Sequence, residues 1–131
     1  MQHNWTNLRL RTTLTILTGV VCATIALAAS ANDPERGRET FEKRCTGCHT
    51  LDKAKLGPPL RGVYGRAAGK DRRFTYSDAL KDASITWDES TLDRWLTDTD
   101  SVIPNTDMSF RLNDPEERAS IIAYLKQLSD K

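Results

Sequence analysis

The chain has 131 residues, of which 28% are charged, and its 19 Lys and Arg nearly balance its 18 Asp and Glu. This balance argues against a nucleic-acid-binding protein, because that class needs a clear basic excess. The length fits a single domain, and nothing in the chain shows repeats or the alternating pattern of a strand. We therefore predict one all-α domain.

Residues 1–31 have the pattern of a secretory signal peptide. Arg9 and Arg11 give a positively charged start, and a mostly apolar stretch covers residues 14–29. The small residues of Ala29-Ser30-Ala31 then suit a signal-peptidase site. The alternative is an uncleaved anchor in the inner membrane, but threonines dilute a stretch that is barely long enough to span a bilayer.

Cleavage after Ala31 would leave residues 32–131 as an exported, periplasmic domain. Lipidation at Cys22 is disfavoured because Val21 before it is too bulky for the usual lipoprotein signal. Residues 1–31 contain two basic residues and no acidic ones, so the mature domain has 17 basic residues against 18 acidic ones. It retains one histidine, one methionine and two cysteines.

The first helix of this domain is predicted to run from Asp33-Pro34-Glu35 to about Arg44. Aspartate suits the N-cap, proline suits the first helical position, and an acidic residue suits the first turn. Gly37 and Phe41 are nearly the only residues expected to face the core. Because glycine weakens a helix interior, its presence here predicts a close backbone contact.

The pentapeptide Cys45-Thr46-Gly47-Cys48-His49 follows this helix and has the C-x-x-C-H signature of covalent haem attachment. The two thiols add across the haem vinyl groups, and His49 is placed to be the proximal iron ligand. A redox C-x-x-C pair would need a surrounding βαβ pattern, and a zinc site would need more ligands than the mature chain offers. The motif therefore predicts one covalent haem c, which would also stabilise a small domain that lacks disulfides.

The middle of the chain is predicted to be rich in loops. Residues 56–60 contain two prolines and should be extended, and residues 61–73 contain three glycines and should form a solvated loop. Residues 76–82 can form a short helix. Residues 86–89 resemble a capping box that starts another helix. One face of that helix carries Leu92, Trp95 and Leu96.

Met108 lies in a loop before the last predicted helix and is the only methionine of the mature domain. A lone methionine is often core filler, but beside a haem its thioether is the expected sixth ligand. Since His49 is the only histidine left, two-histidine ligation within this domain is excluded. The last helix begins at Asp114-Pro115, and we expect it to cross the first helix at Gly37, with Tyr124 packed there.

Taken together, these motifs resemble class I cytochrome c of the mitochondrial type and its short bacterial relatives. The resemblance covers residues 36–128 and rests on Gly37 with Phe41, residues 45–49, 57–60, 62–66, 74–77 and 85–87, Ile103-Pro104 with Thr106 and Met108, Phe110, and residues 123–125. It implies the class I cytochrome c fold, in which the N- and C-terminal helices cross and loops wrap the haem.

The resemblance also implies contacts to the haem. The carbonyl of Pro58 would accept from Nδ1 of His49, which fixes the imidazole tautomer. Buried propionates need several hydrogen-bond donors. The resemblance assigns this role to Arg66, Tyr76, Ser77, Trp87 and Thr106.

The chain departs from the family pattern in three respects. Trp95 replaces a tyrosine that bonds the ligand sulfur, and Leu80 replaces an asparagine near a propionate. The lysines that ring the haem edge in mitochondrial cytochromes are missing. The corresponding stretches carry Asp98, Asp100, Ser101 and Asp107.

The function implied is that of a monomeric single-electron carrier and not an enzyme, because two protein ligands would close the iron. The donor would be a quinol-oxidising cytochrome complex or a dehydrogenase, and the acceptor an oxidase or reductase. Contact with a membrane is expected only if the signal is left uncleaved. Two other hypotheses are a ligand-binding or peroxidatic haem protein with Met108 detached, and a tethered subunit serving one dehydrogenase or oxidase.

Overall fold

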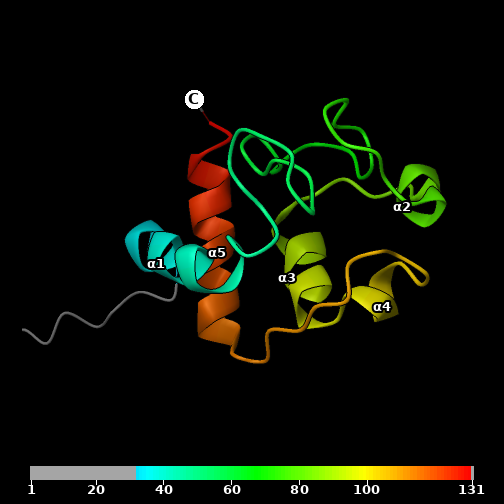
Figure 1. The fold of residues 1–131 in the computed structure, drawn as a ribbon. Helices are drawn as coiled ribbons and strands as arrows, with labels where there is room; N and C mark the ends of the chain where they lie inside the picture. The colour runs from blue at the N-terminus through cyan, green and yellow to red at the C-terminus, as the bar shows by residue number, and fades with distance from the viewer. Residues whose placement is uncertain (1–31, 131) are drawn as a thin grey trace, which may run out of the picture.

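The computed structural model describes residues 32–130, which form five helices joined by long loops (Figure 1). The predicted signal peptide lies outside this part of the chain. Within it there is no strand, and one isolated β-bridge joins Ala67 and Thr86. No helix in residues 32–130 is both long and apolar enough to cross a membrane. The prediction of an all-α domain is confirmed.

Two capped helices, α1 (Pro34–Arg44) and α5 (Pro115–Gln127), begin and end the described chain. The side chain of Asp33 accepts from the backbone N–H of Glu35 at 3.0 Å, and Asp114 caps α5 in the same way. Such caps satisfy backbone donors that have no partner within the helix. Both helix starts lie where the sequence predicts them.

Helices α1 and α5 cross at Gly37, as predicted. A Cβ at this position would collide with the carbonyl oxygen of Ser120 and lie 2.8 Å from Cβ of Tyr124. Only glycine therefore allows the two backbones to approach this closely. The rings of Phe41 and Tyr124 pack beside the crossing, with their centroids 5.6 Å apart.

Three helices lie between these two: α2 (Asp78–Asp82), α3 (Glu89–Thr97) and α4 (Thr99–Val102). Helix α2 starts two residues later than predicted, because Ser77 is still extended. The sequence does not predict α4, which is a single turn with no apolar repeat.

The capping box of α3 differs from the prediction. Asp88, not Thr86, is the N-cap: its carboxylate accepts from the N–H of Thr91 at 2.8 Å, and the Thr91 hydroxyl accepts from the N–H of Asp88 at 2.8 Å. Thr86 is engaged in the bridge to Ala67. A carboxylate caps a helix at least as well as a hydroxyl, so the box forms two residues later.

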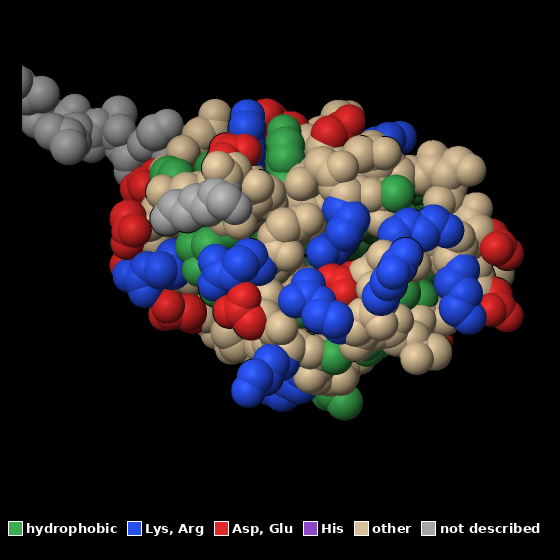
Figure 2. All heavy atoms as spheres, turned by 90° about the horizontal axis from the view of Figure 1, so that it is seen from above, with side chains coloured by type: hydrophobic (Ala, Val, Ile, Leu, Met, Phe, Trp, Pro, Cys, Tyr) green, Lys and Arg blue, Asp and Glu red, His purple; other side chains and the backbone are tan. Residues whose placement is uncertain are grey.

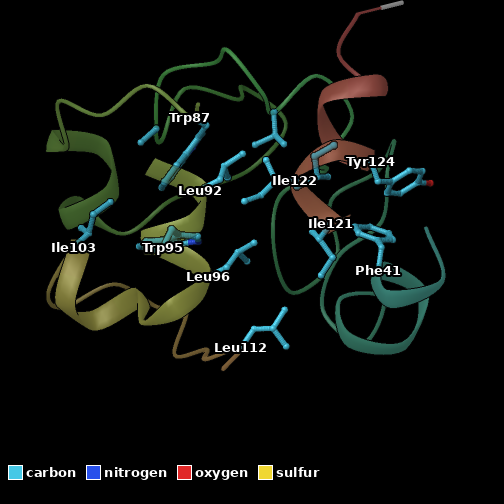
Figure 3. Packing of buried hydrophobic residues seen from close by; sticks show 13 residues of the cluster. Phe41, Trp87, Leu92, Trp95, Leu96, Ile103, Leu112, Ile121, Ile122 and Tyr124 are labelled. Atoms are coloured by element: carbon cyan, nitrogen blue, oxygen red, sulfur yellow. The ribbon is translucent and has the colours of Figure 1, made fainter. Parts of the chain in front are cut away.

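The buried apolar side chains form one core between α3 and the crossed pair (Figure 3). On one side α3 and the segment before it supply Trp87, Leu92 and Trp95. The rings of Trp87 and Trp95 lie 5.2 Å apart. On the other side α1 and α5 supply Phe41, Ile121, Ile122 and Tyr124. This arrangement brings the C-x-x-C-H turn at the end of α1 to the same core as α3.

Candidate haem-binding site

A cavity of about 400 Å³ opens into this core and is lined by α1, α2, α3, α5 and the loops between them. Its wall is mainly apolar, with a few polar side chains that converge on it. This is the usual character of a cofactor site. Apolar members of the wall include Phe41, Leu60, Val63, Phe74, Leu92 and Leu96.

His49 is buried in this wall with a fixed orientation. Its Nδ1 lies 2.8 Å from the carbonyl oxygen of Pro58. Since a carbonyl can only accept, the proton is on Nδ1 and Nε2 keeps its lone pair. Burial lowers the pKa of His49 below its ordinary value, which favours the neutral imidazole. A Cβ at Gly57 would collide with the ring, so glycine is needed there.

The two cysteines and His49 line one cavity because a tight turn follows α1. The N–H of Cys45 donates to the carbonyl of Phe41 at 2.8 Å, and the N–H of His49 donates to the carbonyl of Cys45 at 2.8 Å. Burial, with a smaller contribution from Cys48, raises the pKa of the Cys45 thiol to about 11. The thiol is therefore neutral, and an uncharged thioether would suit the same place.

Met108 lines the cavity from a loop whose end is tied to α4. Thr99 is fully buried. Its N–H donates to the carbonyl of Phe110 at 3.3 Å, and its hydroxyl accepts from the N–H of Phe110 at 3.0 Å. Asn105 turns the loop with a φ of 63°, a conformation that asparagine tolerates better than most residues. No motif in the sequence indicates that Thr99 anchors this loop.

Four of the five predicted propionate donors line the cavity, namely Arg66, Tyr76, Ser77 and Trp87. The hydroxyl oxygen of Ser77 is buried and has no hydrogen-bond partner within residues 32–130. Burial raises the pKa of Tyr76, so its hydroxyl stays protonated and can donate. Thr106, the fifth, is not among the residues that line the cavity. Its hydroxyl accepts from the N–H of Met108 at 3.4 Å.

Arg66 also contacts an acid that the sequence analysis missed. Its Nη1 donates to Oδ2 of Asp71 at 2.9 Å, and its Nη2 donates to the carbonyl of Pro59 at 3.2 Å. Arg73 binds the same carboxylate from the other side. The one signal available was a single acid among the bases of residues 70–73.

A family comparison identifies this arrangement. The model of the family described as Cytochrome c matches residues 34–129, which is most of the chain. The chain belongs to the cytochrome c family. As a class I c-type cytochrome it is an electron carrier that binds one covalent haem c, through Cys45 and Cys48 of its C-x-x-C-H motif.

Individual relatives agree with the family. The chain is 45% identical over 103 residues to a cytochrome c of Chlamydomonas reinhardtii, covering 76% of this chain and 92% of that protein. It is 40% identical over 113 residues to a cytochrome c2 of Rhodomicrobium vannielii, covering 83% and 90%. The solved structure of cytochrome cH from Methylobacterium extorquens aligns with a TM-score of 0.69 and 40% identity, covering 72% of this chain and 98% of that chain.

The residues of this cytochrome fit haem c. The wall is apolar, the imidazole is neutral and held by a carbonyl, and Ser77 keeps an unused buried hydroxyl. Within residues 32–130, no three His, Cys, Asp or Glu side chains gather as a metal site.

Two positions where the cytochrome departs from the family pattern also belong to the cavity wall. Trp95 is 6% exposed and packs against Trp87, so its indole forms part of the wall. Leu80 contributes an apolar side chain that has no donor to offer. The polar part of the wall therefore depends on fewer residues, Arg66 and Ser77 among them.

Proposed function

We propose that this cytochrome carries single electrons in a periplasmic respiratory or related electron-transfer chain, with His49 and Met108 as the axial ligands of its haem iron. The observation that carries the proposal is that a neutral, oriented imidazole and a thioether line one apolar cavity beside the two cysteines. When bound, haem c supplies a one-electron couple between ferric and ferrous iron.

The residues of the chain have separate tasks in this proposal. The carbonyl of Pro58 accepts a hydrogen bond from Nδ1–H of His49, which would make the lone pair of Nε2 a stronger ligand for iron. The thioether of Met108 would stabilise ferrous iron and so raise the reduction potential. The propionates would be bound by Arg66, Tyr76, Ser77, Trp87 and Thr106. If His49 and Met108 both bind the iron, the chain would leave no position for a substrate, so the protein is proposed not to be an enzyme.

The test of this function uses the purified holoprotein. We expect a weak red absorption band in the ferric state, which is the signature of the bond between methionine sulfur and iron, and a reversible one-electron wave in voltammetry. Absence of the band, together with rapid binding of carbon monoxide to the ferrous protein, would support the ligand-binding or peroxidatic alternative instead.

Processing of residues 1–31 can be tested separately. We expect the native mature protein to begin at Asn32, because Ala31 ends the small-residue pattern of a signal-peptidase site. Intact-mass measurement should show residues 32–131 plus one haem. A membrane-bound product that retains Arg9 would instead indicate an uncleaved anchor or a tethered subunit.

Charge distribution suggests the class of redox partner. Exposed bases gather on the loop face formed by residues 52–73, which we call the basic face (Figure 2). Its bases are Lys53, Lys55, Arg61, Lys70, Arg72 and Arg73. Leu56 lies in the same segment, is 75% exposed, and lines the mouth of the cavity.

The Met108 side has the opposite charge. Asp100 and Asp107 are exposed, and Asp107 lines the cavity. Arg44 also lines the cavity, but its charge is partly offset by Glu117 at 3.3 Å. We propose that a partner with an acidic docking face meets the basic face around Leu56, and that a uniformly basic ring is not used.

Replacing Asp100 and Asp107 by lysine tests whether the Met108 side borders the docking site. We expect faster oxidation by an acidic-faced partner and a steeper dependence on salt, since such fields change association rates roughly 10- to 1000-fold at low salt. Asp98 is left intact because it binds Arg111 at 2.9 Å. The measurement is the stopped-flow rate of oxidation at several ionic strengths, and the control is Glu89→Lys, which changes the charge of another exposed residue. Unchanged rates and salt slope would place both carboxylates outside the docking site.

A further inference from the structure

Asp71 is a buried, fully bonded carboxylate. Its side chain is 4% exposed. Arg66 Nη1 donates to Oδ2 at 2.9 Å, while Arg73 donates from Nε to Oδ1 at 2.9 Å and from Nη2 to Oδ2 at 2.7 Å. The backbone N–H of Arg73 adds a bond to Oδ1 at 2.9 Å. This negative charge is therefore fixed in position and shielded from bulk water.

Arg66 connects Asp71 to the haem cavity. Arg66 is part of the cavity wall, and its side chain is 21% exposed. A guanidinium has five N–H donors, of which two are used here, one by Asp71 and one by the carbonyl of Pro59. These two bonds fix the plane of the guanidinium. The remaining donors are available to a haem carboxylate, and Ser77, whose hydroxyl has no partner within residues 32–130, lines the same cavity.

We propose that Asp71 is a positioning residue for the haem site, which orients Arg66 toward a haem carboxylate and lowers the reduction potential with its fixed negative charge. The proposal rests on the proposed contact between Arg66 and a propionate. Ferric haem has one more positive charge than ferrous haem, so a fixed carboxylate nearby stabilises the ferric form more. A buried charge is also poorly screened by salt.

Asp71 stays ionised because its contacts lower the pKa of its carboxyl. The hydrogen bonds from Arg73, opposed by burial and reinforced by the charge of Arg66, bring the pKa of this carboxyl down to about 2. Asp71 is thus ionised at neutral pH. Removing the charge would leave the guanidiniums of Arg66 and Arg73 without their shared carboxylate, and this loss of fixed negative charge raises the potential.

Voltammetry of the holoprotein variant Asp71→Asn tests the proposal. We expect the potential to rise and the shift to persist at high ionic strength. The matched control is Asp52→Asn, which removes the same charge from an exposed aspartate paired with Arg61 at 2.6 Å. If the two variants have equal potentials at low and high salt, Asp71 only holds its loop and the proposal is wrong.

A second pair of variants covers failure of Asp71→Asn to fold or retain haem. Arg73→Gln leaves the Asp71 carboxylate less compensated, so the potential should fall further than in Arg72→Gln, which removes an exposed neighbouring charge. Equal shifts in these two variants would also overturn the proposal. The red ferric band of the unmodified protein tests the axial ligation independently. Failure of the proposed function can therefore be distinguished from failure of the proposal for Asp71.

Discussion

Met108→Ala should keep the haem attached, lower the reduction potential, and open the iron to cyanide or carbon monoxide. The covalent bonds through Cys45 and Cys48 do not depend on Met108, so haem content should not change. The potential should fall because a thioether favours ferrous iron. Axial ligands span about 0.8 V across haem proteins, so we expect a fall on the order of 0.1 V.

The variant Met108→Leu separates loss of sulfur from loss of volume. Leucine fills nearly the same space in the half-buried position but cannot bind iron. Both variants should lose the red ferric band and bind carbon monoxide in the ferrous state, and Met108→Ala should be the less stable of the two. An unchanged potential in both would remove Met108 from the ligand set.

Replacing Cys45 and Cys48 together by serine should leave the haem-free chain largely unfolded. The core of this small domain surrounds a cavity of about 400 Å³, so much of its apolar wall would face water without haem. Burying roughly 400 Å² of apolar haem surface contributes on the order of 10 kcal/mol at about 25 cal/mol per Å². That is comparable to the whole stability of a typical domain, about 5–15 kcal/mol.

Far-UV circular dichroism of the haem-free double variant is the measurement. Gly47→Ala is the control, because a Cβ at Gly47 meets no atom within 4 Å and the attachment cysteines are kept. The control should load haem and fold. Native-like helix content in the double variant without haem would show that the apolar core is sufficient on its own.

The sequence determined the features that depend on short-range chemistry. The caps at Asp33 and Asp114 follow from a side-chain oxygen that reaches backbone donors two residues away. The spacing of Cys45, Cys48 and His49 is set by one turn of chain. Gly37 was predictable as a contact point because glycine destabilises a helix interior unless a close backbone contact requires it. The crossing with α5 is that contact.

Tertiary structure alone decided the features that depend on which groups compete for a partner. Thr86 and Asp88 are both plausible N-caps, and the choice of Asp88 is seen only once Thr86 is paired with Ala67. Thr99 anchors the Met108 loop through Phe110, which is 11 residues away. Such bonds leave no periodic pattern in the sequence.

The polar part of the haem site shows the same division. The family motifs predict that Arg66 donates to a propionate, but they do not indicate that a buried acid already binds its guanidinium. In the sequence Asp71 is simply one acidic residue in a basic loop. Only in the folded chain is it buried and paired with both Arg66 and Arg73. The position of the Asp71 charge is fixed by burial and by its ion pairs. Neither can be predicted from the sequence, because both depend on segments that meet only in the folded chain.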